Sequence, residues 1–191
     1  LPDDLSTLTG RVESLAISPV KSLRMIIAEK ITLTTHGMQH AGFTDRSMML
    51  AVPSETGRAD YQRFSQREEP ALSHIIQSLD RYGRLRIFPE GSHPLSEMCP
   101  SDQFASYDAD LLTVEPVAGT VMNAECIEGA AIDQIRHYLW KFRQNVDQIV
   151  LLRALKPDND VLPPNGENML FTDGGQLLIT NEESLNFLNA Q

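Results

Sequence analysis

The sequence predicts a mostly β fold of the α+β class. Eleven glycines and eleven prolines among 191 residues favour many turns and short strands over a helical bundle. Apolar runs of strand length recur between these turns, and only a few stretches show helical spacing. No apolar run approaches the ~18 residues that a membrane-spanning helix requires, so we expect no membrane association.

The first half of the chain is expected to be rich in strands. We predict strands at 11–17, 24–34, 46–52, 61–66 and 84–88. A helix is predicted over 70–82, because Pro70 suits a first helical turn and the apolar residues that follow recur at i, i+3, i+4 and i+7. These apolar residues are Leu72, Ile75, Ile76 and Leu79.

The second half mixes strands and helices. Two short strands are predicted within 111–122, and a compact buried strand at 149–153. A helix is predicted over 128–143, with Ile132, Ile135, Leu139 and Phe142 on one face. A long polar loop at 156–168, a strand at 177–179 and a helix from about 182 complete the expected order.

A candidate anion-binding turn lies at Ile17–Ser22. Pro19 has no N–H and a fixed φ, so a strand that reaches it must break and present Lys21 and Ser22 at its end. A lysine beside a hydroxyl can direct several donors at an anion. The alternative is a solvated lysine after an ordinary proline turn.

Further motifs follow in order: Asp45-Arg46 before an apolar strand, and Gln66-Arg67 shortly before Pro70. Together with the turn around Pro19, this series resembles the N-terminal β-barrel domain of MOSC proteins, the family named for the C-terminal domain of molybdenum-cofactor sulfurases. Ser18 stands where that family usually has an aromatic residue. The resemblance implies a barrel-like domain at 9–110.

The last third is similar to the beginning of the MOSC domain proper. The resemblance rests on Phe171, Asp173, the apolar run 177–179, and Ser184-Leu185 near the start of a helix. An Arg-Pro-Asn segment and an essential cysteine should come next in the family pattern, but the 191 residues end before them. We therefore expect the first part of a β-rich MOSC domain at 111–191, truncated.

The resemblance implies a set of cofactor-binding residues and assigns no catalytic residue and no metal ligand. Residues that match family positions at the phosphate and pterin of the molybdenum cofactor are Lys21, Ser22, Arg46 and Arg67, with Asp173 and Gly174 expected on the opposite wall. Simpler roles are a salt bridge to Asp45 for Arg46, ion pairs with the neighbouring glutamates for Arg67, and a plain turn for Asp173-Gly174.

The two cysteines offer no replacement for the missing one. Cys99 and Cys126 are far apart, which suggests reduced thiols and a cytoplasmic location, and neither has a basic neighbour in sequence to lower its pKa. We expect structural or incidental roles for both. These 191 residues are thus expected to be inactive, to lack the cofactor and to self-associate.

The resemblance implies that the parent protein binds the molybdenum cofactor. It would be an oxidoreductase acting on N-hydroxylated compounds, supplied by a ferredoxin-like or other electron-transfer partner, or else a sulfur carrier. The formal net charge of −10 argues against nucleic acid as a partner. The five histidines form no reliable zinc pattern. The alternative function is a non-catalytic β-rich module that binds an anionic ligand or a protein.

Overall fold

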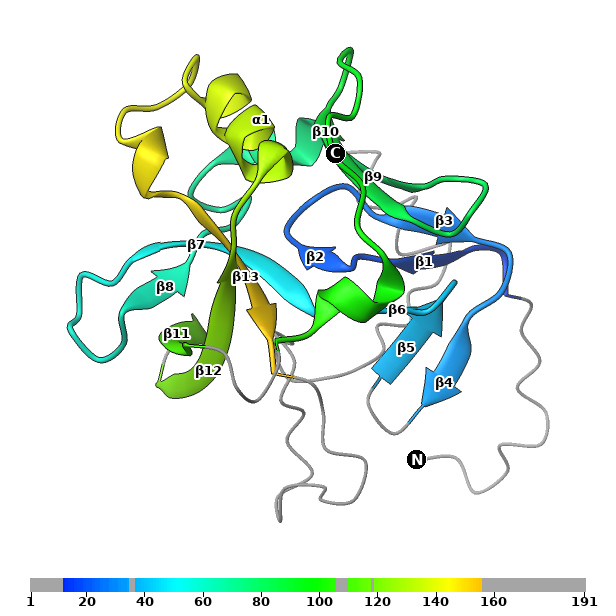
Figure 1. The fold of residues 1–191 in the computed structure, drawn as a ribbon, viewed down its shortest axis with the longest axis horizontal. Helices are drawn as coiled ribbons and strands as arrows, with labels where there is room; N and C mark the ends of the chain where they lie inside the picture. Colours follow the sequence, from blue (N-terminus) through cyan, green and yellow to red (C-terminus); the bar gives the residue numbers. More distant parts are fainter. Residues whose placement is uncertain (1–11, 35–36, 106–109, 118, 156–191) are drawn as a thin grey trace, which may run out of the picture.

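The computed structural model describes residues 12–34, 37–105, 110–117 and 119–155. Over these residues the fold is mostly β, as the sequence predicts, and it contains a closed five-stranded barrel (Figure 1). Within the described residues, no helix is both long and apolar enough to cross a membrane.

The barrel is built from five strands that pair in a closed ring. They are β7 (Met48–Pro53), β8 (Tyr61–Arg63), β11 (Leu112–Val117), β12 (Thr120–Ile127) and β13 (Val150–Ala154). Neighbouring strands are antiparallel except for the parallel pair β8 and β11, and β13 returns to pair with β7. This closure leaves none of the five as a free edge along its whole length.

Small side chains line one face of these strands. Ala51, Ala124 and Ala154 come from three different strands and are fully or almost fully buried, in one apolar cluster with Met49 and Leu152. A barrel of few strands has room only for side chains of limited volume on its inner face. The cluster therefore matches the interior that a five-stranded barrel requires.

Short strands surround the barrel. β2 (Val20–Lys21) runs parallel to the start of β7, and β1 (Leu15–Ile17) pairs with β3 (Ile26–Ala28). A small sheet follows, made of β4 (Thr32–Thr34), β5 (Gly37–His40) and β6 (Phe43–Thr44). β9 (Ile75–Leu79) and β10 (Leu85–Pro89) form an antiparallel hairpin.

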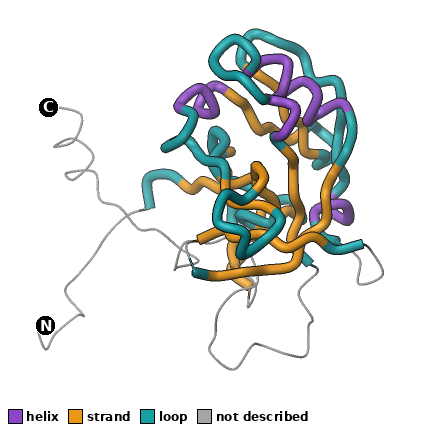
Figure 2. Tube along the Cα trace, turned by 90° about the vertical axis from the view of Figure 1, so that its left-hand side faces the viewer, coloured by secondary structure: helices purple, strands orange, loops and turns teal. Residues whose placement is uncertain are grey.

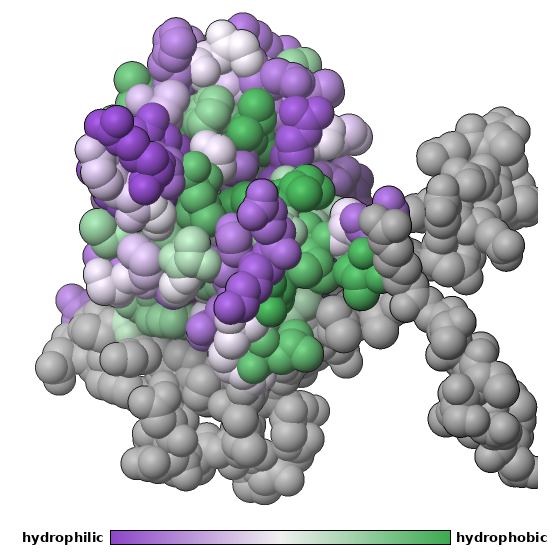
Figure 3. Space-filling view, turned by 90° about the vertical axis from the view of Figure 1, so that its right-hand side faces the viewer, coloured by the Kyte–Doolittle hydropathy of each residue, from purple (hydrophilic) through white to green (hydrophobic). Residues whose placement is uncertain are grey.

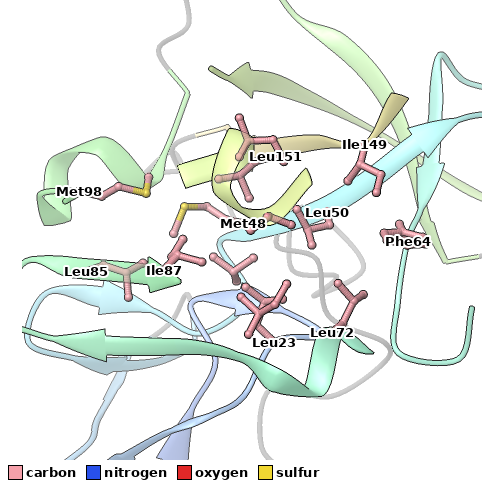
Figure 4. Close-up of a cluster of buried hydrophobic side chains, with 14 of the residues drawn as sticks. Leu23, Met48, Leu50, Phe64, Leu72, Leu85, Ile87, Met98, Ile149 and Leu151 are labelled. Atoms are coloured by element: carbon pink, nitrogen blue, oxygen red, sulfur yellow. The ribbon is translucent and has the colours of Figure 1, made fainter. Parts of the chain in front are cut away.

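The main core lies between the outer face of the barrel and these added elements. Helix α1 (Ala130–Leu139) contributes Ile132, Ile135 and Leu139, which are buried against residues of β7, β10 and β13. Figure 4 shows part of this cluster, including Met48, Leu50, Ile87 and Leu151. The predicted helix over 128–143 is confirmed in its central part.

The helical turns gather mostly toward one end of the molecule (Figure 2). Besides α1 they comprise three single-turn 3-10 helices at Pro70–His74, Pro100–Gln103 and Val146–Gln148 among the described residues. On the side that carries β3 and β4, apolar areas interrupt the polar surface (Figure 3). Among the apolar residues in and beside these two strands, Met25, Ile27 and Leu33 are largely exposed.

The predicted helix over 70–82 is wrong. The Glu69 side chain accepts the N–H of Ala71, and the helical turn that begins at Pro70 ends at His74. β9 then starts at Ile75, and its pairing with β10 buries Ile75 and Gln77 on the same face. The apolar spacing is compatible with a helix and with a strand, and pairing with β10 stabilises the strand.

Two further boundaries differ from expectation. The single strand predicted over 24–34 is divided into β3 and β4, which belong to different sheets. β11, β12 and β13 come after residue 110, yet they complete the same barrel as β7 and β8. The start of a second domain over 111–191 stays a prediction, because residues 156–191 lie outside the described ranges.

Candidate anion-binding site

One edge of β7 is shared by two strands. β13 pairs with Met48 to Ala51, while β2 pairs with Met48 and Met49 and β8 with Ala51 to Pro53. The β7 residues that pair with β13 include residues that also pair with β2 and with β8. β13 therefore occupies one edge of β7, and β2 and β8 both lie along the other edge. β2 is parallel and β8 antiparallel to β7, so their carboxyl ends converge there. Lys21 and Arg63 are the last residues of these two strands.

The turn around Pro19 lies directly against the Asp45-Arg46 segment. The N–H of Arg46 donates to the Ser18 carbonyl at 2.8 Å, and the N–H of Met48 donates to the Pro19 carbonyl at 2.9 Å. In the opposite direction, the N–H of Ser18 donates to Oδ1 of Asp45 at 2.6 Å. Folding thus brings Lys21, Ser22 and Arg46 onto two adjoining, hydrogen-bonded segments.

Two of the expected site residues have left-handed backbone. Ser22 has a φ of 69° and Arg46 a φ of 54°. Such a conformation costs a non-glycine residue roughly 1–3 kcal/mol, and it recurs at functional sites because the surrounding structure can enforce it. Here the enforcing contacts are the hydrogen bonds between the two segments. The break that Pro19 predicts is present: β1 ends at Ile17, and the short β2 that follows Pro19 ends at Lys21, with a turn at Ser22.

Lys21 is buried, with 6% of the residue exposed. It pairs with Met49, and paired residues of neighbouring strands project to the same face, so Lys21 lies on the face that lines the barrel. Arg63 pairs with Ala51, two positions along β7, and shares that face. Sequence reasoning missed Arg63, since only the strand register relates it to Lys21.

Arg46 is partly exposed, and its Nη1 lies 3.7 Å from Oδ2 of Asp45. The simpler role considered for Arg46, an ion pair with its neighbour, is thus present, although this distance is too long for a hydrogen bond. Asp45 itself is almost completely buried, and its Oδ2 accepts no hydrogen bond from the described residues. Burial raises the pKa of the Asp45 carboxyl, with the Ser18 N–H and the Arg46 charge opposing the shift.

The other expected site residues are placed differently. Arg67 is exposed in the turn that follows β8, where its N–H donates to Oγ of Ser65. The neighbouring Glu68 binds Ser65, and Glu69 caps the next helical turn. The side chain of Arg67 is not joined to the other site residues by any hydrogen bond or ion pair in the described part of the chain. Asp173 and Gly174 lie outside the described residues.

A buried glutamine holds the segment that carries Lys21. Oε1 of Gln77 accepts the N–H of Val20 at 2.7 Å, and its Nε2 donates to Oγ of Ser18 and to the carbonyls of Val20 and Arg24. Gln77 comes from β9, far away in the sequence. It completes the hydrogen bonds of a short strand that has β7 as its one neighbour among the described strands.

A second buried glutamine holds the segment that carries Arg46. Oε1 of Gln103 accepts the N–H of Thr44 at 2.5 Å and the hydroxyl of Ser47, while Nε2 donates to the Gly42 carbonyl. Sequence reasoning missed both glutamines. For Gln77 the signal would be a polar residue at a position that the strand pattern buries, which the incorrect helix at 70–82 concealed. Gln103 ends a 3-10 turn and has no such signal in the sequence.

Neither described cysteine resembles a metal ligand in its surroundings. Burial raises the pKa of the Cys126 thiol to about 11, and the hydrogen bond from its Sγ to Glu128 contributes. At neutral pH such a thiol stays protonated, whereas a metal binds the thiolate. Cys99 is exposed and begins a 3-10 turn. Across the described ranges, no three His, Cys, Asp or Glu residues cluster as metal ligands.

The family model described as the MOSC N-terminal beta barrel domain matches residues 9–130. The match includes Lys21, Ser22, Arg46 and Arg67, and all barrel strands except β13. No curated protein matches the chain.

Proposed function

Because the chain belongs to the MOSC N-terminal beta barrel domain family, we propose that the site formed by Lys21, Ser22 and Arg46 binds the phosphate of a molybdenum cofactor. The observation that carries the proposal is the convergence of the segments 18–22 and 45–49, which places two cations and a hydroxyl on adjoining backbone. The strained backbone at Ser22 and Arg46 supports a functional reason for this arrangement.

The residues present suit a phosphate. Arg46 offers a planar fork of N–H donors that matches phosphate oxygens, Lys21 a compact charge, and Ser22 a hydroxyl. Arg63 adds a third cation on the face that Lys21 occupies. In the described part of the chain nothing comparable suits the metal, since the Cys126 thiol is protonated at neutral pH.

When bound, such a cofactor supplies the two-electron redox chemistry of molybdenum. The role we propose for this chain is to hold the phosphate end and so to orient the pterin. We further propose that the whole protein either reduces N-hydroxylated compounds, with electrons from a ferredoxin-like or similar partner, or carries sulfur.

The test is cofactor retention. The whole native protein is produced in cells that make the cofactor, and the pterin that co-purifies is measured as its fluorescent oxidation product; the 191 residues alone, which we expect to lack the cofactor, are measured beside it. Lys21→Gln and Arg46→Gln should each reduce the pterin at least about tenfold, since each loses a charge-assisted hydrogen bond to phosphate. Arg58→Gln, at an exposed position in the loop before β8, is the matched control and should retain it.

The second candidate function is a non-catalytic module that binds an anion. It is favoured by one observation, the two cations Lys21 and Arg63 on one face of the barrel strands, which suit any small anion. Binding of inorganic sulfate or phosphate without any retained pterin would select this candidate. If Lys21→Gln retained pterin and anion as well as the wild type does, both candidate functions would be contradicted.

A further inference from the structure

Asp45 is a buried acid beside the proposed anion site. Its Oδ1 accepts the Ser18 N–H at 2.6 Å, which fixes the segment that leads to Lys21. Its Oδ2 is buried and has no hydrogen bond within the described ranges, and Nη1 of Arg46 lies 3.7 Å away. A buried carboxylate oxygen without a partner is costly, and such atoms in folded proteins call for an explanation.

Two features make this carboxyl sensitive to a bound anion. Arg46 is the charged group that opposes its neutralisation, and Lys21 is the other cation on the segments bonded to it. The buried glutamines that hold these segments, Gln77 and Gln103, are neutral. An anion that engages Arg46 adds negative charge beside Asp45 and draws the guanidinium away from Oδ2. Both effects favour the protonated carboxylic acid.

We propose that Asp45 is a positioning residue whose protonation is coupled to anion binding: its Oδ1 holds the Ser18–Lys21 segment, and its Oδ2 takes up a proton when an anion binds at Arg46. The proposal rests on the proposed function for the existence of the anion site. It goes beyond that function by predicting the pH dependence of binding: anion binding is accompanied by proton uptake, so the affinity for the anion increases as the pH falls.

A purely structural role for Asp45 makes a different prediction. If Asp45 only held Ser18, replacing it with asparagine would weaken or preserve anion binding equally at every pH. If protonation is coupled to binding, Asp45→Asn removes the competing charge and keeps an acceptor for the Ser18 N–H. The variant should then bind an anion more tightly than the wild type near neutral pH, and with less dependence on pH.

The experiment titrates the full chain with inorganic sulfate, which keeps its charge over the range from about pH 5 to about pH 8. Affinity is read from amide NMR shifts for the wild type, Asp45→Asn and the exposed control Glu29→Gln. We expect wild-type and control affinity to rise about tenfold as the pH falls, because Asp45 takes up a proton when the anion binds. Asp45→Asn should already show the tighter affinity at the upper end of the range.

A second measurement needs no variant. Calorimetric titration of the wild type with sulfate, in two buffers of different ionisation enthalpy, should show net proton uptake. The role of Asp45 would be overturned if the wild type and Asp45→Asn showed equal pH dependence, or if no proton were taken up. The anion site itself would still stand in that case, provided that Lys21→Gln abolished sulfate binding. Absence of sulfate binding in the wild type would overturn the anion site itself, and the role of Asp45 with it.

Discussion

The side-chain amide of Gln77 takes the place of a neighbouring strand for Val20: its oxygen accepts the Val20 N–H at 2.7 Å and its nitrogen donates to the Val20 carbonyl at 3.1 Å. One residue of β9 thus satisfies both backbone groups of the residue that precedes Lys21. The position of the buried lysine therefore depends on a hairpin that begins more than fifty residues later in the chain.

Gln77→Leu should destabilise the protein by about 1–3 kcal/mol, because the Val20 N–H would stay buried without an acceptor. Unfolding in urea measures the change. Gln66→Leu, at an exposed position after β8, is the control and should have little effect. Equal stability of the two variants would show that water replaces the amide.

Asp80 should make stability fall in acid. Burial alone would raise its pKa, but the N–H groups of Arg84 and Tyr82 and the charge of Arg84 outweigh burial and lower the pKa from 3.8 to about 2. A carboxyl whose pKa is lower in the folded state stabilises the protein above its unfolded pKa. This stabilisation disappears as the pH falls from about 4 to about 2.

Asp80→Asn should therefore melt at a lower temperature than the wild type near neutral pH, and the difference should shrink toward pH 2. Melting curves followed by circular dichroism over this range provide the test. Asp147→Asn, in an exposed turn, is the control. A constant difference at every pH would mean that the Asp80 hydrogen bonds do not depend on its charge.

Cys126 should resist alkylation at mildly alkaline pH. With a pKa of about 11, roughly one thiol in a thousand is ionised near pH 8, and only the thiolate reacts. Mass spectrometry after iodoacetamide treatment should show label on the exposed Cys99 first. Glu128→Gln removes the negative charge beside Cys126, so it should speed labelling there, whereas Glu55→Gln should not.

Ile135→Ala should cost about 2–5 kcal/mol of stability, since Ile135 is fully buried between α1 and the main core and its loss leaves a cavity. Chemical denaturation measures the loss. His137→Ala, exposed on the same helix, should stay within about 0.5 kcal/mol of the wild type. A small effect at Ile135 would indicate that the core closes around the missing atoms.

Local patterns explain what sequence reasoning predicted correctly. The apolar runs gave β7, β10 and β13, and the helical spacing of Ile132, Ile135 and Leu139 gave α1. The break at Pro19 follows from the missing N–H of proline. Each of these features depends on residues close together in the chain.

Features that depend on distant partners could not be predicted. Ile75 to Leu79 fit a helix and a strand equally, and only pairing with β10 distinguishes them. The shared edge of β7, which relates Lys21 to Arg63, requires the register of three separate strands. The placement of Gln77 and Gln103 depends in the same way on segments remote in sequence.

The pairing of β7 with β13 has a consequence for biosynthesis. The segments that carry Lys21 and Arg46 leave the ribosome early, but the strand that covers the other edge of β7 is among the last of the described elements to be made. Contacts between residues so far apart in sequence form slowly, and a strand edge that is still unpaired is prone to aggregate. We therefore expect the yield of native protein to depend on how quickly translation supplies residues 150–154, and chaperones that shield nascent strands to raise it.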